Sequence, residues 1–76
     1  MPPSVRDAVH GCFCNLANAK MGGVRATDID KVIEGMRELV NNVAPGNDAT
    51  IDTLVSKLQA DPAALLAEMM PPADPT

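Results

Sequence analysis

His10, Cys12 and Cys14 are the residues of this sequence whose types could do chemistry, and they alternate within the run HGCFC. Imidazole and thiolate are common zinc ligands, and a cysteine with a histidine is also the pairing of a thiol nucleophile with its base. In a helix, however, residues two apart point about 200° apart around the axis. Cys12 therefore cannot share one ion with His10 and Cys14.

The pair His10 and Cys14 lies four residues apart, so both side chains could project from one helix face. The chain has one histidine and two cysteines, whereas a zinc site needs four ligands, or three and a water. A thiol nucleophile needs a lowered pKa and an oxyanion site, and no loop of the sequence suggests either. We predict no metal, no cofactor and no enzymatic activity, with Cys12 packed as a small core residue.

The segment 27–43 is the element around which the rest of the chain is expected to be organised. Thr27 is a candidate N-cap with Asp30 as its capping-box partner, and Pro45 and Gly46 follow the end. Its apolar residues recur at steps of three and four, which predicts one buried helical stripe. This stripe consists of Ile29, Val32, Ile33, Met36, Leu39, Val40 and Val43, and the core is expected to centre on Ile33, Met36 and Val40.

Three further helices are predicted, which makes the fold class all-α: a bundle of two longer and two short helices. The first is expected over 4–21 with Ser4 as its N-cap and Gly22-Gly23 as its stop. The third runs from Asp48 or Thr50 to Gln59, with a stripe of Ile51, Leu54, Val55 and Leu58. The fourth runs from Pro62 to about Met70 behind Asp61 as N-cap, with Leu65, Leu66 and Met69 on one side.

The first helix carries two apolar stripes. The main stripe holds Val5, Ala8, Val9, Cys12, Phe13, Leu16 and Ala19, and the second holds His10, Cys14, Ala17 and Met21. Such a helix lies centrally in the bundle, or its second stripe meets another chain. The second possibility predicts a homodimer through this helix, and replacing Ala17 with glutamate would then give a folded monomer.

The length and the net charge of the chain limit its possible domain organisation and its possible partners. Seventy-six residues make one domain, 1–76, with an ordered core expected over 4–70 and proline-rich tails at 1–3 and 71–76. The net charge is −4 and the six basic residues are scattered, so direct nucleic-acid binding and a DNA-binding regulator are disfavoured. No apolar run approaches about 20 residues, and no secretory signal is seen. Two cysteines this close together are expected to be reduced thiols of a cytoplasmic protein.

These patterns favour a protein–protein docking or adaptor module that uses an apolar helix surface. The candidate interface residues are His10, Cys14, Ala17, Met21, Leu66, Met69 and Met70. The alternative is a small acidic inhibitor or regulator that blocks a basic site on an enzyme or on a nucleic-acid-binding complex. Its candidate surface is formed by Asp28, Asp30, Glu34 and Glu38. Apolar docking should tolerate salt, whereas acidic blocking should weaken as salt rises.

Overall fold

The computed structural model describes residues 2–69, which form four helices and no strand. The helices are α1 (Pro3–Met21), α2 (Ala26–Val43), α3 (Asp48–Ala60) and α4 (Pro62–Met69). The predicted all-α bundle with two longer and two short helices is therefore confirmed. Met70 and the predicted tail 71–76 lie outside the described residues.

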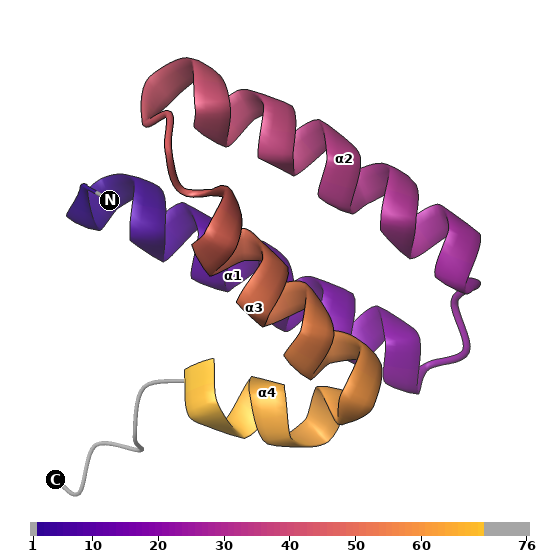
Figure 1. Cartoon of the computed structure of the whole chain (residues 1–76). Helices are drawn as coiled ribbons and strands as arrows, with labels where there is room; N and C mark the ends of the chain where they lie inside the picture. Colours follow the sequence, from indigo (N-terminus) through magenta and orange to yellow (C-terminus); the bar gives the residue numbers. More distant parts are fainter. Residues whose placement is uncertain (1, 70–76) are drawn as a thin grey trace, which may run out of the picture.

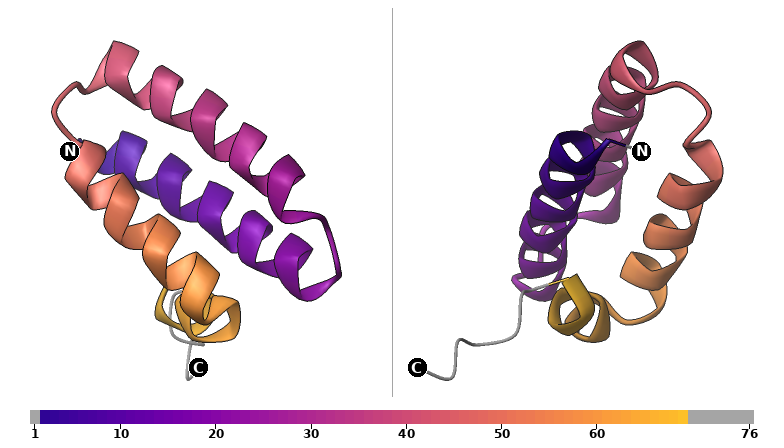
Figure 2. Two further views of the ribbon diagram at one scale, coloured as in Figure 1. Left: turned by 45° about the vertical axis from the view of Figure 1, so that its right-hand side comes forward. Right: turned by 90° about the vertical axis from the view of Figure 1, so that its left-hand side faces the viewer.

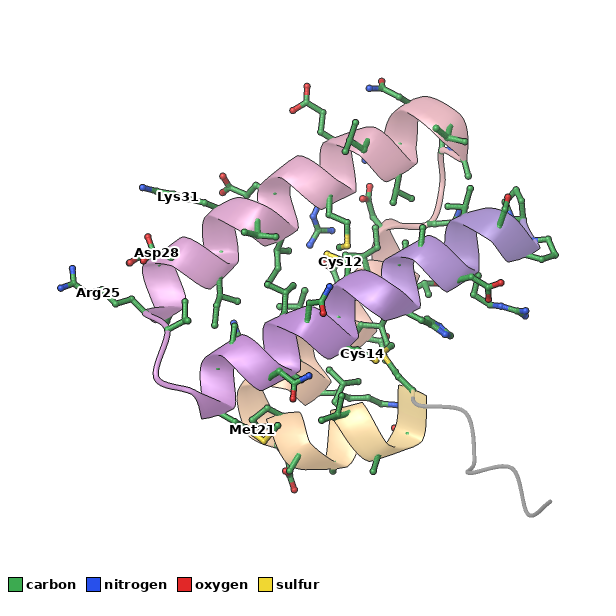
Figure 3. The ribbon with its side chains drawn as sticks, turned by 180° about the vertical axis from the view of Figure 1, so that it is seen from behind. Cys12, Cys14, Met21, Arg25, Asp28 and Lys31 are labelled. Carbon is green, nitrogen blue, oxygen red and sulfur yellow. The ribbon has the colours of Figure 1, made fainter. Side chains whose placement is uncertain are left out.

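The two long helices, α1 and α2, run antiparallel and form one layer of the molecule (Figure 1). Helix α3 packs against both of them from one side, and α4 closes the end of the bundle against α1 and α3 (Figure 2). Seen from the other side, α1 and α2 lie in front and no helix of the described chain covers them (Figure 3). The bundle is thus covered on one face of its α1/α2 layer.

The helix starts differ from the predicted caps at two of the three sites. Helix α1 begins at Pro3, so Ser4 lies inside its first turn and Pro3 is not part of a lead-in. Helix α2 begins at Ala26 behind an extended Arg25, and neither Thr27 nor Asp30 forms the predicted capping box. Proline at the first position and backbone geometry alone start these helices. At α4 the prediction is confirmed, because the Ala64 amide donates to Asp61 Oδ1 at 3.1 Å.

Glycines with left-handed backbone make the two longer turns possible. Gly23 has φ of +93° directly after α1, and Gly46 has φ of +90° between α2 and α3. After α1, the Val24 amide donates to the Ala19 carbonyl at 3.0 Å and the Gly23 amide donates to the Lys20 carbonyl at 3.2 Å. This is the Schellman pattern of a helix end. Gly22-Gly23 is therefore a helix stop, as predicted.

All four helices contribute buried side chains to one core. Phe13 and Ile51 are fully buried, and Leu58 and Leu65 are 1% exposed. Leu54 of α3 is also buried and Val55 is half-buried, which confirms the predicted stripe of α3. On the surface, an ion pair between Lys57 and Glu68 at 2.8 Å joins α3 to α4.

The predicted stripe of α2 is only partly in this core. Ile29, Ile33 and Val40 are each 5% exposed, and Met36 is half-buried. Val32 is 49% exposed, and Leu39 and Val43 are each 68% exposed, so their predicted burial is wrong. The reason is that α2 has only two neighbouring helices. Helices α1 and α3 cover one half of the stripe, and no helix of the described chain covers the other half.

Candidate docking groove

An apolar groove of about 590 Å³ lies between α1 and α2 on their uncovered face. Its walls come from the N-terminal half of α1 and the C-terminal half of α2, which meet because the two helices are antiparallel. No lining residue is charged. The lining residues are Ser4, Val5, Ala8, Val9 and Cys12 of α1, and Val32, Gly35, Met36, Leu39, Val40 and Val43 of α2.

The α2 side of the groove is a ridge of large apolar side chains, formed by Val32, Met36, Leu39 and Val43. Their spacing of four, three and four residues keeps them on one line along the helix, as in the seam of a coiled coil. At 100° per residue they lie within about 60° of one another around the axis. The α2 ridge is therefore a continuous apolar line of three helical turns.

The α1 side also contains two valines, of which Val5 is half-buried and Val9 is buried, and its other lining residues are small. Ser4 and Ala8 are exposed, and Cys12 is half-buried. We call Ser4, Ala8 and Cys12 the α1 trough. Large side chains thus form the exposed part of the α2 side, and small side chains form the exposed part of the α1 side.

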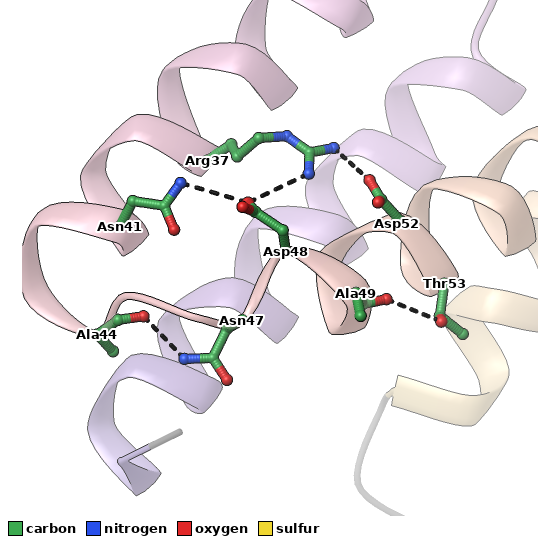
Figure 4. Close-up of polar contacts among 8 residues, drawn as sticks. All are labelled: Arg37, Asn41, Ala44, Asn47, Asp48, Ala49, Asp52 and Thr53. Carbon is green, nitrogen blue, oxygen red and sulfur yellow. Dashed lines mark hydrogen bonds and ion pairs between the residues drawn. The ribbon is translucent and has the colours of Figure 1, made fainter.

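Polar contacts hold the opposite side of α2 to α3 (Figure 4). The Arg37 guanidinium pairs with Asp52 at 2.8 Å and with Asp48 at 3.4 Å, and the Asn41 amide donates to Asp48 Oδ1 at 3.3 Å. The hydrogen bond from Arg37 to Asp52 raises the pKa of the guanidinium. These contacts, which the scattered charges of the sequence did not reveal, place α3 on the side of α2 away from the α2 ridge.

Cys12 and Cys14 are both free and half-buried, but they lie on different sides of α1 (Figure 3). Cys12 lies between α1 and α2 in the groove, and Cys14 lies towards α4. Burial raises the pKa of the Cys12 thiol. At neutral pH this thiol is therefore protonated, which is the non-nucleophilic form. The predicted core position of Cys12 is observed only in part, because the side chain is half-buried, packs against the core cluster and lines the groove.

The predicted interface stripe of α1 is dispersed by the packing of α4. Ala17 is 0% exposed and belongs to the core, so it is not a surface residue. His10 and Cys14 are half-buried, and Met21 is 47% exposed beside the helix end. The central position offered as one explanation of the two stripes is thus observed, since α1 contacts α2, α3 and α4.

The predicted interface residues of α4 also contribute to the fold. Leu66 and Met69 are half-buried and pack against the core cluster. Met70 lies outside the described residues. Within residues 2–69, the large apolar side chains with the greatest exposed fractions, Leu39 and Val43, are on α2 and not on α4.

The four predicted acidic residues, Asp28, Asp30, Glu34 and Glu38, are all exposed on α2. Asp30, Glu34 and Glu38 lie within about 80° of one another around the helix axis, so these three share one face of α2, and Asp28 lies outside it. At 100° per residue, Lys31 lies between Asp28 and Glu38 around the helix. Arg25 also lies beside Asp28 at the start of α2 (Figure 3).

Metal-ligating clusters and membrane-spanning helices are both absent from the described part of the chain. Residues 2–69 contain no group of three or more histidine, cysteine, aspartate or glutamate side chains that could hold a metal ion. None of the four helices is long and apolar enough to cross a membrane.

Comparisons of the chain with models of known protein families, with curated proteins and with solved structures found no match.

Two glycines inside the long helices give a matched test of the groove wall. Gly11 on α1 and Gly35 on α2 are exposed, and a methyl group added at either position meets no atom within 4 Å. Each change to alanine should raise the free energy of unfolding by about 0.5–1 kcal/mol, because glycine loses more backbone entropy in a helix. Urea unfolding measures this gain. A loss of stability in Gly35→Ala alone would show that the groove is closed at this position.

Proposed function

We propose that this protein is a non-catalytic docking module, and that its binding site is the groove between α1 and α2. The observation that carries the proposal is the exposure of the α2 ridge: Val32 is 49% exposed, and Leu39 and Val43 are each 68% exposed. Completing the burial of side chains of this size contributes about 1 kcal/mol each. A partner that covers the ridge therefore gains a substantial part of its binding free energy from three residues.

The shape and chemistry of the groove fit a helix of a protein better than a small molecule. A small-molecule site normally adds convergent polar groups that orient the ligand inside a concave pocket. This groove is lined by uncharged residues and lies open along two helices. An apolar helix face laid along it would contact the ridge at i, i+4 and i+7 spacing, which is the usual mode of helix-in-groove recognition.

A photoreactive benzophenone amino acid placed at position 39 tests this proposal. We expect ultraviolet irradiation of the full-length variant in an extract of its source cells to give defined covalent adducts. The same amino acid at position 56, on the exposed side of α3, is the matched control and should give none. Adding Val43→Glu to the position 39 variant should remove the adducts, because it places a charge in the groove.

Equal adducts from positions 39 and 56, or adducts that persist with Val43→Glu, would contradict the proposal. The mass of the adduct identifies the occupant. Twice the chain mass indicates a second copy, and any other mass indicates a different protein.

A further inference from the structure

We infer that the occupant of the groove is a second copy of this chain, packed face to face so that α1 and α2 of both copies form one antiparallel four-helix bundle. The inference rests on the proposed function of the groove as a docking surface. Three observations support it: the complementary side-chain sizes of the two groove walls, the size of the uncovered face and the position of the charges.

The two walls of the groove are complementary to each other under twofold symmetry. Consider a twofold axis parallel to the helices, lying above the groove between α1 and α2. It places α1 of one copy over α2 of the other, at the same height along the axis and in the opposite direction. The large side chains of the α2 ridge of each copy then meet the small side chains of the α1 trough of the other, and each contact occurs twice, as an isologous interface requires.

The register of this contact follows from the groove lining. The lining spans residues 4–12 of α1 and residues 32–43 of α2. Helix α1 ends at Met21 and α2 begins at Ala26 after a short turn, so in this antiparallel pair residues whose numbers add up to about 47 lie level (21 and 26). Ala8 therefore lies level with Leu39 (8 and 39). In the symmetric pair, Leu39 of one copy therefore lies against Ala8 of the other, a large side chain over a small one.

Taken as a flat area over the whole length of α1 and α2, the uncovered face is slightly smaller than one side of a standard dimer interface. Helices of 19 and 18 residues extend about 27 Å, and two of them side by side are about 20 Å wide. The flat face is thus roughly 500 Å². Its accessible surface is larger, because side chains expose their sides as well as their tips. A standard interface buries about 600–1,000 Å² on each partner.

A second copy covers this face more completely than a lone helix would. A single helix in the groove buries one ridge and leaves its own outer face to be covered by something else. A second copy brings its own ridge, its own trough and a layer of α3 and α4 behind them. The α1 and α2 helices of the two copies, four helices together, then enclose one apolar seam. This is the arrangement of an antiparallel four-helix bundle.

The charges do not oppose this packing at close range. No residue that lines the groove is charged, and Asp28, which lies four residues before Val32 on the same side of α2, is exposed beyond the end of the groove. Repulsion between the two copies acts only at longer distance and is screened by salt. The dimer should therefore strengthen as salt rises, whereas an electrostatic complex with a basic partner would weaken.

A charge-exchange experiment tests both the dimer and its geometry. In sedimentation equilibrium we expect the parent chain to be a dimer, and Leu39→Lys and Ala8→Glu each to be a folded monomer, with association weakened at least about 100-fold. Mixing the two variants should restore a dimer. In the mixed pair the introduced lysine of one copy faces the introduced glutamate of the other, and the second contact remains Leu39 on Ala8.

Ser56→Glu and Ser56→Lys add the same charges on the exposed side of α3 and should leave the dimer intact. Circular dichroism verifies that each variant is folded. A parent chain that stays monomeric up to millimolar concentration overturns the second-copy inference. Failure of the mixed variants to associate, with a dimeric parent, overturns the face-to-face geometry.

The two cysteines provide an independent readout within the same chain. As concentration rises through the dimerisation range, alkylation of Cys12 should slow, because Cys12 lies in the groove, and alkylation of Cys14 should not change. Protection of Cys14 in place of Cys12 would move the interface to the second stripe of α1 and overturn the inference.

The two proposals fail separately. A monomeric parent that still gives position 39 adducts with another protein overturns the second copy and supports the docking module. A monomeric parent with no adduct at position 39 contradicts both.

Discussion

Replacing Ile33 with aspartate is expected to unfold the domain, whereas the same change at the preceding residue, Val32, should leave it folded. Ile33 is 5% exposed in the core, and Val32 is 49% exposed on the α2 ridge. Burying an unpaired carboxylate costs several kcal/mol, and a domain of this length has about 4–11 kcal/mol of total stability. Thermal melts followed by circular dichroism measure both variants.

Comparing Ile33→Asp with Val32→Asp separates the effect of burial from the effect of residue type, because both replaced residues are β-branched, apolar and in the same helix. A cooperative melt of Ile33→Asp within a few degrees of the parent would contradict the buried position of Ile33. Unfolding of Val32→Asp would show that the groove is part of the core. The docking proposal adds a second expectation: Val32→Asp should stay folded and lose its partner.

Replacing Ala17 with glutamate is expected to destroy the packing of α4 and to unfold the chain. Ala17 is 0% exposed, and Leu65 of α4 is 1% exposed. Glutamate at position 17 adds both volume and charge to a filled site, and each of these changes destabilises a core. The folded monomer predicted from the stripe pattern is therefore no longer the expected result.

Asn18→Glu is the matched control, because Asn18 is exposed on the same helix and receives the same side chain. We expect its unfolding transition in urea to lie within about 0.5 kcal/mol of the parent. If Ala17→Glu unfolds at the same urea concentration as the parent, α4 does not lie on this part of α1.

The exposed apolar surface lies on α2, whereas the sequence pattern predicted it on α1 and α4. The all-round apolar composition of α4 and the second stripe of α1 pointed to an interface around Ala17 and Leu66. In the structure these two elements cover each other, and Leu66 packs against the core. The exposed apolar surface is instead on α2, whose residues Leu39 and Val43 belong to the most regular stripe in the sequence.

The sequence by itself determined the helices and their ends. The three- and four-residue periodicity predicts α2, and glycine pairs and prolines delimit the other helices to within one or two residues. The Asp61-Pro62 start of α4 was predicted correctly because its cap is local: the side chain bonds an amide three residues away. Ser4 and Thr27 were wrong as caps, because each lies one residue inside its helix, and no side chain caps the start of α1 or α2.

Only the tertiary structure decided which apolar residues are buried. Periodicity shows that Val32, Ile33, Leu39 and Val40 share one side of α2, but burial depends on how many neighbouring helices are available to cover that side. Here α3 is held to the far side of α2 by Arg37, and the short α4 covers α1. One half of the stripe thus enters the core, and the other half remains as the wall of a groove.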